Sequence, residues 1–163
     1  MNKIIITGPE SSGKTTLCEN LAQHFKLSFS KEFARFYLEK NGGNYNQSDL
    51  LEIAKGQLLS EKNHQILDTD LITIKIWSEY KYGACDTWIL EKIKEQKLEQ
   101  RFYLLCKPDI PWQSDPLREN PDNRDELFEI YKMELEELGL IYSIIEEENR
   151  LENSIEKISL YLS

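Results

Sequence analysis

An α/β fold with a parallel five-stranded sheet, doubly wound so that helices cover both of its faces, is the architecture that the sequence predicts. Five short apolar stretches alternate along the chain with longer amphipathic stretches of helical periodicity. Such alternation indicates right-handed crossovers and a sheet that is buried on both sides. A length of 163 residues suffices for one core of ordinary size, so we expect a single domain over residues 1–163.

The first strand runs into a glycine-rich segment. Residues 3–7 predict a buried strand, residues 16–25 predict an amphipathic helix, and the pattern Gly-x4-Gly-Lys-Thr between them begins at Gly8. This pattern is typical of the phosphate-binding loop (P-loop) of a P-loop NTPase. The glycines let successive amides point at one anion, Lys14 reaches the β- and γ-phosphates, and the Thr15 hydroxyl binds Mg²⁺. We expect ATP phosphates to contact Gly8, Glu10, Ser11, Ser12, Gly13, Lys14, Thr15 and Thr16.

Two charged residues follow the second strand. Residues 27–30 alternate apolar with polar side chains, as a short strand does, and a helix is expected over residues 32–40. Glu32 and Arg35 therefore lie just beyond a strand end, at the edge where open α/β sheets bind ligands. We expect Arg35 to bind the substrate and Glu32 to bind its hydroxyl. The alternative is a surface pair one helical turn apart.

A long helix is expected from an N-cap at Ser48 and Asp49 to about His64, because apolar residues form one stripe along it. Gly56 inside this helix lowers its stability. His64 has no histidine or cysteine at metal-ligand spacing, so we interpret it as structural or solvated.

Two carboxylates end the third strand. Residues 65–70 form an apolar run that finishes with Asp68 and Asp70, in the manner of a Walker B site. Residues two apart in a strand face the same side, so both carboxylates are expected in the cleft, Asp68 toward Mg²⁺ and Asp70 toward the substrate. The alternative is a polar strand end at which Asp70 caps the next helix.

The next elements have clear boundaries. A helix is predicted over residues 71–82, where Gly83 ends it, and a second helix over residues 86–96. Residues 101–106 then predict a buried strand.

Residues 107–124 predict a shaped loop. Four of the five prolines lie in this stretch, which excludes a long helix. A loop of this length in a compact domain is usually functional. We expect a lid in which Arg118 and Arg124 close on the phosphates while Trp112 forms a wall of the acceptor pocket. The alternative is a surface loop whose tryptophan packs into the core.

The chain closes with three more elements. A helix over residues 125–138 ends at Gly139, a strand follows at residues 140–145, and apolar residues at helical spacing predict a last helix over residues 150–162. The acceptor is then expected beside the ends of the second and third strands.

Composition limits the classes of partner. A net charge of −9 argues against non-specific binding of nucleic acid or anionic lipid, since both require a basic surface. The only apolar run near the N-terminus is three isoleucines, so neither a signal peptide nor a membrane span is expected. The three cysteines are far apart and lack a Cys-x-x-Cys spacing, which favours reduced thiols in a cytoplasmic protein. The oligomeric state stays open.

Spaced motifs also give the chain a family resemblance, which covers it nearly end to end. The motifs are Gly-Pro-Glu-Ser-Ser-Gly-Lys-Thr-Thr at 8–16, Glu-Phe-Ala-Arg at 32–35, Gln57, Asp-Thr-Asp at 68–70 followed by Thr73, and Pro-Trp-x-x-Asp-x-Leu-Arg at 111–118 with Arg124 behind.

The chain resembles the ribosylnicotinamide kinase domain of the NadR type, a small P-loop kinase that phosphorylates nicotinamide riboside to the mononucleotide. The resemblance implies that the acceptor is a pyridine riboside and that Trp112 contacts its ring. Longer members of the family carry an adenylyltransferase domain with a His-x-Gly-His motif, which this sequence lacks. The expected product is therefore the mononucleotide and not NAD.

Two functions from different classes stay open. One is a kinase that moves the γ-phosphoryl group of ATP to a riboside hydroxyl, with Glu32 or Asp70 taking the proton. The other is a non-catalytic switch that binds ATP or GTP and passes its state to a partner. An ATPase and a kinase of another nucleoside also stay open. The carboxylates at two strand ends, the arginines of the expected lid and the lack of a guanine-reading Asn/Thr-Lys-x-Asp motif favour the kinase.

Overall fold

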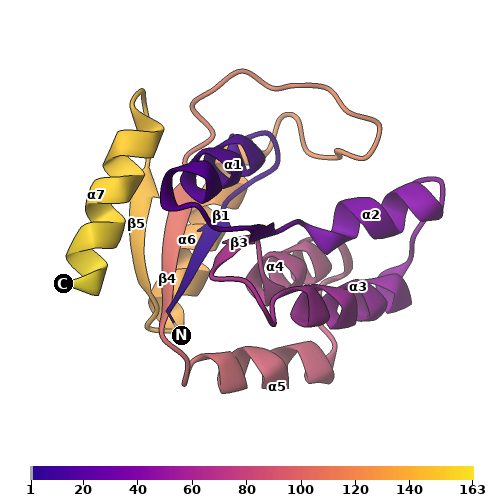
Figure 1. The fold of residues 1–163 in the computed structure, drawn as a ribbon. Coiled ribbons are helices and arrows are strands. Elements are labelled where there is room, and N and C mark those ends of the chain that lie inside the picture. The colour runs from indigo at the N-terminus through magenta and orange to yellow at the C-terminus, as the bar shows by residue number, and fades with distance from the viewer. Residues whose placement is uncertain (1) are drawn as a thin grey trace.

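Strands and helices alternate along the chain as predicted (Figure 1). The structure is a computed structural model that describes residues 2–163. Its elements are β1 (Lys3–Thr7), α1 (Lys14–Phe25), β2 (Phe29–Ser30), α2 (Phe33–Lys40), α3 (Gln47–Ser60), β3 (Ile66–Asp68), α4 (Leu71–Tyr82), α5 (Thr87–Gln96), β4 (Arg101–Cys106), α6 (Arg124–Glu137), β5 (Ile141–Ile145) and α7 (Arg150–Leu162).

All five strands are parallel and lie in the order β2-β3-β1-β4-β5, which confirms the predicted sheet. Because the strands are parallel, their carboxyl ends meet at one edge. Ile6 pairs with Asp68 across β1 and β3, and Thr7 pairs with Leu105 across β1 and β4. The segment after β1 is therefore flanked by the ends of β3 and β4.

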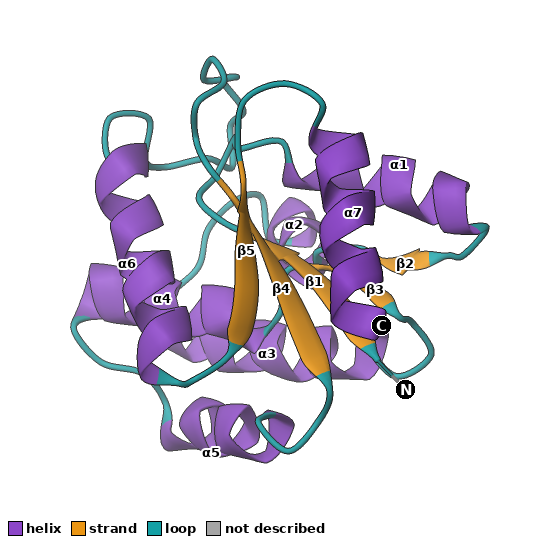
Figure 2. Ribbon diagram, turned by 90° about the vertical axis from the view of Figure 1, so that its left-hand side faces the viewer, coloured by secondary structure: helices purple, strands orange, loops and turns teal. Residues whose placement is uncertain are grey.

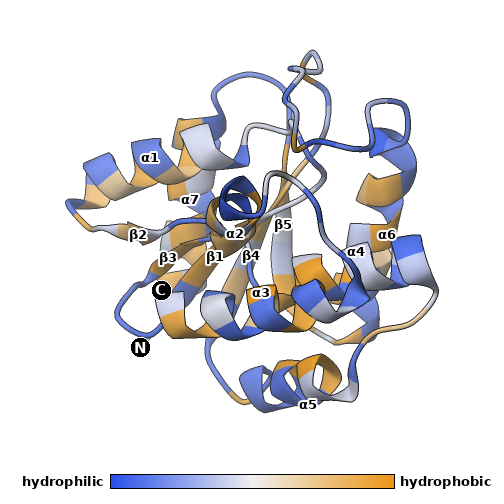
Figure 3. Ribbon diagram, turned by 90° about the vertical axis from the view of Figure 1, so that its right-hand side faces the viewer, coloured by the Kyte–Doolittle hydropathy of each residue, from blue (hydrophilic) through white to orange (hydrophobic). Residues whose placement is uncertain are grey.

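Helices cover both faces of the sheet (Figure 2). Ile4 and Ile6 of β1 point to the face covered by α1 and α7, where they join a core that includes Leu17 and Ile158. Ile5 points to the opposite face, where α3 to α6 and Ala34 of α2 build the larger core. Figure 3 shows hydrophobic residues concentrated on the strands and on the helix surfaces turned toward them. The described helices include none with the length and hydrophobicity that a membrane crossing requires.

Helix α3 begins two residues earlier than predicted, because its N-cap is Asn46. The Asn46 side chain accepts hydrogen bonds from Ser48 N and Asp49 N, and the Asp49 carboxylate accepts one from Asn46 N. This reciprocal capping box satisfies amide groups that the helix itself leaves free. Helix α3 also ends earlier, at Ser60.

Gly56 lies where the first residue of α2 packs against α3. A Cβ atom on Gly56 would lie 2.0 Å from Cε1 of Phe33, the first residue of α2. The backbone N–H of Phe33 also donates to Oε1 of Gln57, at 3.0 Å. The glycine that weakens α3 as an isolated helix is thus what allows α2 to pack against it.

Asp70 lies in the core and not in the cleft. Strand β3 ends at Asp68 because Thr69 has a left-handed backbone, with φ of 69°, and this breaks the alternation on which the prediction for Asp70 relied. The Asp70 side chain is 0% exposed. Its Oδ2 accepts hydrogen bonds from Arg101 Nη2 at 3.0 Å and Tyr103 Oη at 2.6 Å. The prediction that Asp70 binds substrate or acts as a catalytic base is therefore wrong.

The capping alternative for Asp70 is the correct one. Its Oδ1 accepts a hydrogen bond from Ile72 N at 3.1 Å, which caps α4. Glu61 lies 3.4 Å from Arg101 on the same buried cluster. Burial raises the pKa of Glu61 to about 7, and the Arg101 charge opposes that rise. A buried ionic cluster is thus formed by Asp70, Arg101, Tyr103 and Glu61.

We predict that Gly56→Ala destabilises the protein, although alanine is the better helix former by about 1 kcal/mol. Overpacking against the Phe33 ring is expected to lower the free energy of unfolding by about 1–2 kcal/mol in urea titrations. The double variant Gly56→Ala/Phe33→Leu supplies the control, since it removes the ring atoms that the new methyl group meets. A Gly56→Ala protein as stable as the unaltered one would refute the close packing.

We also predict that Asp70→Asn lowers the free energy of unfolding by about 3 kcal/mol, because it leaves Arg101 buried with a weakened partner set. Asparagine still caps a helix, so the loss measures the ion pair. Asp86→Asn is the matched control, since Asp86 caps α5 through Trp88 N but is exposed. Urea unfolding should change by no more than about 0.5 kcal/mol for that control. Equal effects of the two variants would contradict the buried role of Asp70.

Candidate active site

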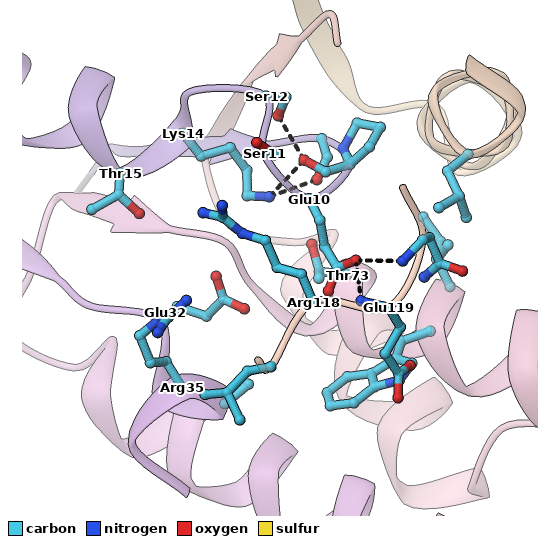
Figure 4. Close-up of a pocket in the computed structure, with 18 of the residues that line it drawn as sticks. Glu10, Ser11, Ser12, Lys14, Thr15, Glu32, Arg35, Thr73, Arg118 and Glu119 are labelled. Carbon is cyan, nitrogen blue, oxygen red and sulfur yellow. Dashed lines mark hydrogen bonds between the residues drawn. The ribbon is translucent and has the colours of Figure 1, made fainter. Parts of the chain in front are cut away.

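A cavity of about 490 Å³ opens at the carboxyl edge of the sheet. Its walls are residues 8–16, the start of α2, one face of α4, the loop between β4 and α6, and the first turns of α6. Figure 4 shows side chains from these separate segments converging on one space. The predicted ligand-binding edge is therefore hollowed where the motifs meet.

The glycine-rich segment packs tightly against the end of β4. Gly8 has φ of 138°, and a Cβ atom there would lie 2.6 Å from the carbonyl oxygen of Cys106. Only glycine fits such an approach. Lys14 Nζ donates to the carbonyl oxygens of Gly8 at 2.8 Å and Pro9 at 3.0 Å, which closes the loop on itself. All eight residues predicted to bind phosphate line the cavity, at the N-terminus of α1.

Thr15 lines the cavity and forms a hydroxyl–carboxylate pair with Asp68, which is buried and is not among the lining residues. Thr15 Oγ1 donates to Asp68 Oδ2 at 2.7 Å. Asp68 is 2% exposed, and its Oδ1 has no hydrogen-bond partner in the structure. Burial raises the pKa of Asp68, while Lys14 and the Thr15 hydrogen bond oppose the rise. A buried carboxylate oxygen without a partner, beside a P-loop hydroxyl, fits the ligands that Mg²⁺ prefers.

Such a metal ion would depend on the nucleotide for further ligands. Within residues 2–163, no three His, Cys, Asp or Glu side chains are grouped so as to hold a metal. Mg²⁺ in nucleotide sites usually keeps several waters and binds one or two protein groups together with phosphate oxygens. The Thr15 hydroxyl and the Asp68 carboxylate fit that mode of binding.

Glu32 faces the cavity from the end of β2. It is the N-cap residue of α2, yet its side chain makes no capping hydrogen bond, which leaves the carboxylate free for a ligand. Burial raises the pKa of Glu32; Lys14 opposes that rise and Asp68 adds to it. Figure 4 shows Lys14, Glu32 and Arg118 directed into the same part of the cavity.

Gln57 fixes the position of Glu32 relative to the end of β3. It is 1% exposed, its Oε1 accepts from Phe33 N, and its Nε2 donates to Thr69 O at 3.3 Å. One buried amide therefore joins the start of α2 to the turn after Asp68. The sequence pointed to Gln57 only as part of the family motifs.

The loop of residues 107–123, here called the 107–123 loop, is held against the P-loop. Glu10 Oε2 accepts from Glu119 N at 3.1 Å and Asn120 N at 3.2 Å, and Ser11 Oγ accepts from Gln113 N at 2.9 Å. The Glu10 carboxylate therefore binds the backbone of the 107–123 loop. The segments joined by these hydrogen bonds form one side of the cavity.

Two arginines connect the 107–123 loop to the cavity. Arg35 of α2 forms an ion pair with Asp115 of the loop, with Nη2 at 2.8 Å from Oδ2. Arg118 lines the cavity and donates from Nη1 to Gln113 O at 2.5 Å. Arg35 also lines the cavity, so both predicted residues are brought to it.

Arg124 and Trp112 are not among the residues that line the cavity. Arg124 Nη1 donates to Ser11 O at 3.0 Å and Ile110 O at 2.9 Å, and its guanidinium lies 5.6 Å from the centroid of the Trp112 ring. The tryptophan therefore supports an arginine behind the P-loop. The expectation that Trp112 forms a wall of the acceptor pocket is not met in this structure.

Sequence reasoning missed the aromatic wall of the cavity. Trp77 and Tyr80 of α4 and Tyr131 of α6 line it, together with Thr73. The Trp77 indole donates from Nε1 to Tyr45 Oη at 3.0 Å, which fixes the ring. Positions 73, 77 and 80 are at helical spacing, so they share one face of the helix that follows the strand ending at Asp68. This spacing could have predicted the aromatic wall from the sequence.

Comparisons with known proteins agree with this geometry. A family model described as an AAA domain matches residues 3–152. The "Trifunctional NAD biosynthesis/regulator protein NadR" of Escherichia coli (strain K12) is 26% identical over 159 residues, which is 90% of this chain and 38% of that protein. The chain thus spans little more than a third of this curated relative.

Two solved structures show the same fold. A crystal structure of NadR protein in complex with NR has a TM-score of 0.72 and 23% identity, over 98% of this chain and 51% of that one. A structure of NadR protein in complex with NAD and AMP-PNP has a TM-score of 0.75 and 24% identity, over 98% of this chain and 49% of that one. The P-loop, its position on the sheet and the match over residues 3–152 together show that the chain belongs to the AAA domain family, with NadR among its relatives.

Proposed function

We propose that this protein is an ATP-dependent kinase that phosphorylates the 5′-hydroxyl of nicotinamide riboside. The observation that carries the proposal is the convergence in one cavity of a P-loop and the Glu32 carboxylate, with Asp68 hydrogen-bonded to the P-loop residue Thr15. A phosphate donor site thereby lies next to a carboxylate that is free to accept a proton. The NadR relative and the NadR structure in complex with NR supply the acceptor.

The transfer would follow the general scheme of phosphoryl transfer. The acceptor hydroxyl oxygen forms a bond to the γ-phosphorus, the bond from that phosphorus to the β,γ-bridging oxygen breaks, and ADP leaves. Lys14 and the N-terminus of α1 bind the phosphates. Thr15 and Asp68 would hold Mg²⁺, which neutralises charge on the β- and γ-phosphates. The hydroxyl proton passes to Glu32.

Burial suits Glu32 to this role. A general base works best when its pKa approaches the pH at which the enzyme operates, and burial raises the pKa of Glu32 in that direction. Asp70, the other candidate base, is enclosed by Arg101 and Tyr103. The choice between the two carboxylates therefore falls on Glu32.

The 107–123 loop would serve as the lid. Its contacts with Glu10 and Ser11 bind it to the phosphate site, and Arg118 brings a positive charge into the cavity. Such a charge stabilises the negative charge that develops on the leaving ADP. Closure of the loop would also exclude water from the transferred phosphoryl group.

The aromatic wall suits a cationic ring. The pyridinium ring of nicotinamide riboside carries a permanent positive charge, and the faces of Trp77, Tyr80 and Tyr131 attract cations. Glu119 also lines the cavity, but its carboxylate is paired with Lys81 of the same wall at 3.1 Å. The aromatic wall is therefore the feature that favours a pyridinium riboside over a neutral nucleoside.

We predict that Glu32→Gln lowers kcat by about 100-fold or more, as expected for loss of a general base, with little change in ATP affinity. In the unaltered enzyme, kcat should fall as the pH drops through the raised pKa of Glu32, because only the ionised carboxylate accepts a proton. The variant should lose this acid limb. Glu52→Gln, on the exposed side of α3, serves as the control. A pH profile that is unchanged in Glu32→Gln would assign the base elsewhere.

We further predict that ADP release is fastest with nicotinamide riboside in a panel that includes uridine and adenosine. Trp77→Leu should raise KM for nicotinamide riboside by about ten-fold, the equivalent of a partly desolvated cation–π contact, and should change KM for uridine much less. Trp112→Leu is the comparison, because Trp112 lies outside the cavity wall. Stoichiometric ATP binding without turnover of any riboside would favour the nucleotide switch over the kinase.

A further inference from the structure

Arg150, the first residue of α7, holds the P-loop from behind. Its side chain is 15% exposed and is not among those lining the cavity. Nη1 donates to Ser12 O at 2.9 Å, and Nη2 donates to Lys107 O at 3.0 Å. Nη2 is also paired with Asp109 Oδ1, and Nε donates to Glu147 O at 3.2 Å.

These partners belong to three separate segments: the P-loop, the start of the 107–123 loop, and the turn between β5 and α7. The last two are also joined directly, since Asp109 Oδ2 accepts from Glu147 N at 2.7 Å and Lys107 N donates to Ile145 O at 2.9 Å. A planar guanidinium with donors in a fixed arrangement suits such a junction. Arg150 therefore connects the P-loop to two segments that are hydrogen-bonded to each other, the start of the 107–123 loop and the turn before α7.

The bond to Ser12 O determines where the next amide points. In a planar trans peptide the C=O of one residue and the N–H of the following residue point in opposite directions. Arg150 is outside the cavity wall, so a Ser12 carbonyl that points to it directs the Gly13 N–H the other way, toward the cavity. Arg124 acts in the same way on Ser11 O, and thus on the Ser12 N–H.

We propose that Arg150 is a positioning residue for the triphosphate, which fixes the Ser12–Gly13 peptide so that the Gly13 amide faces the anion. This inference rests on the proposed function, since it takes the P-loop as the ATP site. Arg124 holds its peptide from the end of the proposed lid. Arg150 holds its peptide from α7 and also binds the first residues of the same loop, through Lys107 O and the Asp109 carboxylate.

The test compares two ligands that share only the phosphates. Dissociation constants are measured by calorimetry for Mg²⁺–ATP and for Mg²⁺–tripolyphosphate, which has no base or ribose. Arg150→Gln should weaken both by the same factor, about ten-fold, the scale of one hydrogen bond from a charged donor. KM for the riboside acceptor should stay the same within about two-fold.

Two further variants separate the bond from the charge. Lys107→Gln removes a positive charge from the same region, where Lys107 Nζ pairs with Glu146 on the surface, and should change both affinities by less than about two-fold. Arg150→Lys keeps the charge but cannot bridge Ser12 O, Lys107 O and Asp109 together, so it should weaken both ligands as well. Circular dichroism establishes that each variant is folded, and Arg150→Lys supports the test if Arg150→Gln does not fold.

Three results would overturn the positioning role. The first is unchanged affinities in both Arg150 variants. The second is a loss of affinity confined to ATP, which would mean that Arg150 acts on the base or the ribose. The third is an equal loss of affinity in Lys107→Gln, which would mean that the effect is due to charge alone. Failure of the unaltered protein to bind either ligand is distinguishable from these. It would contradict the proposed function itself and the positioning role with it.

Discussion

The orientation of the peptide planes in the P-loop is the constraint on which the site depends. A loop can turn its amides toward one anion only if the carbonyls of the same peptides find donors elsewhere. Two of those donors come from outside the P-loop: Arg124 takes the carbonyl of Ser11, and Arg150 takes that of Ser12. The start of α6 and the start of α7 are thus coupled through two consecutive peptides of the P-loop.

The same constraint explains how an acidic chain can bind a triphosphate. The net charge is −9, yet three of the five arginines lie at this site: Arg124 and Arg150 bind carbonyls of the P-loop, and Arg118 belongs to the 107–123 loop beside it. The other arginine that lines the cavity, Arg35, is paired with Asp115. The positive charges required for phosphate are concentrated at one edge of the sheet, and the remaining surface is left negative.

Sequence patterns predicted the sheet, the order of its elements and the P-loop, because each depends on local periodicity or on a fixed spacing. They failed at Asp70, where the result depended on the backbone of one residue, Thr69, and on partners 31 and 33 residues away, Arg101 and Tyr103. An arginine at the start of a strand predicted to be buried was itself a sign that a carboxylate lay nearby, since buried charges are paired. No such sign placed Trp112 behind the P-loop.

The charges in the cavity act on one another, so the parts of the site are not independent. Glu32 and Asp68 both have raised pKa values because they are buried, and Lys14 opposes the rise in each. Each carboxylate serves its proposed role only when ionised, one as a base and the other as a metal ligand. Lys14 therefore supports both, in addition to its proposed role in binding phosphate. Its charge links the nucleotide site to the proton acceptor, and a cation bound at Asp68 would favour ionisation of Glu32 in the same direction.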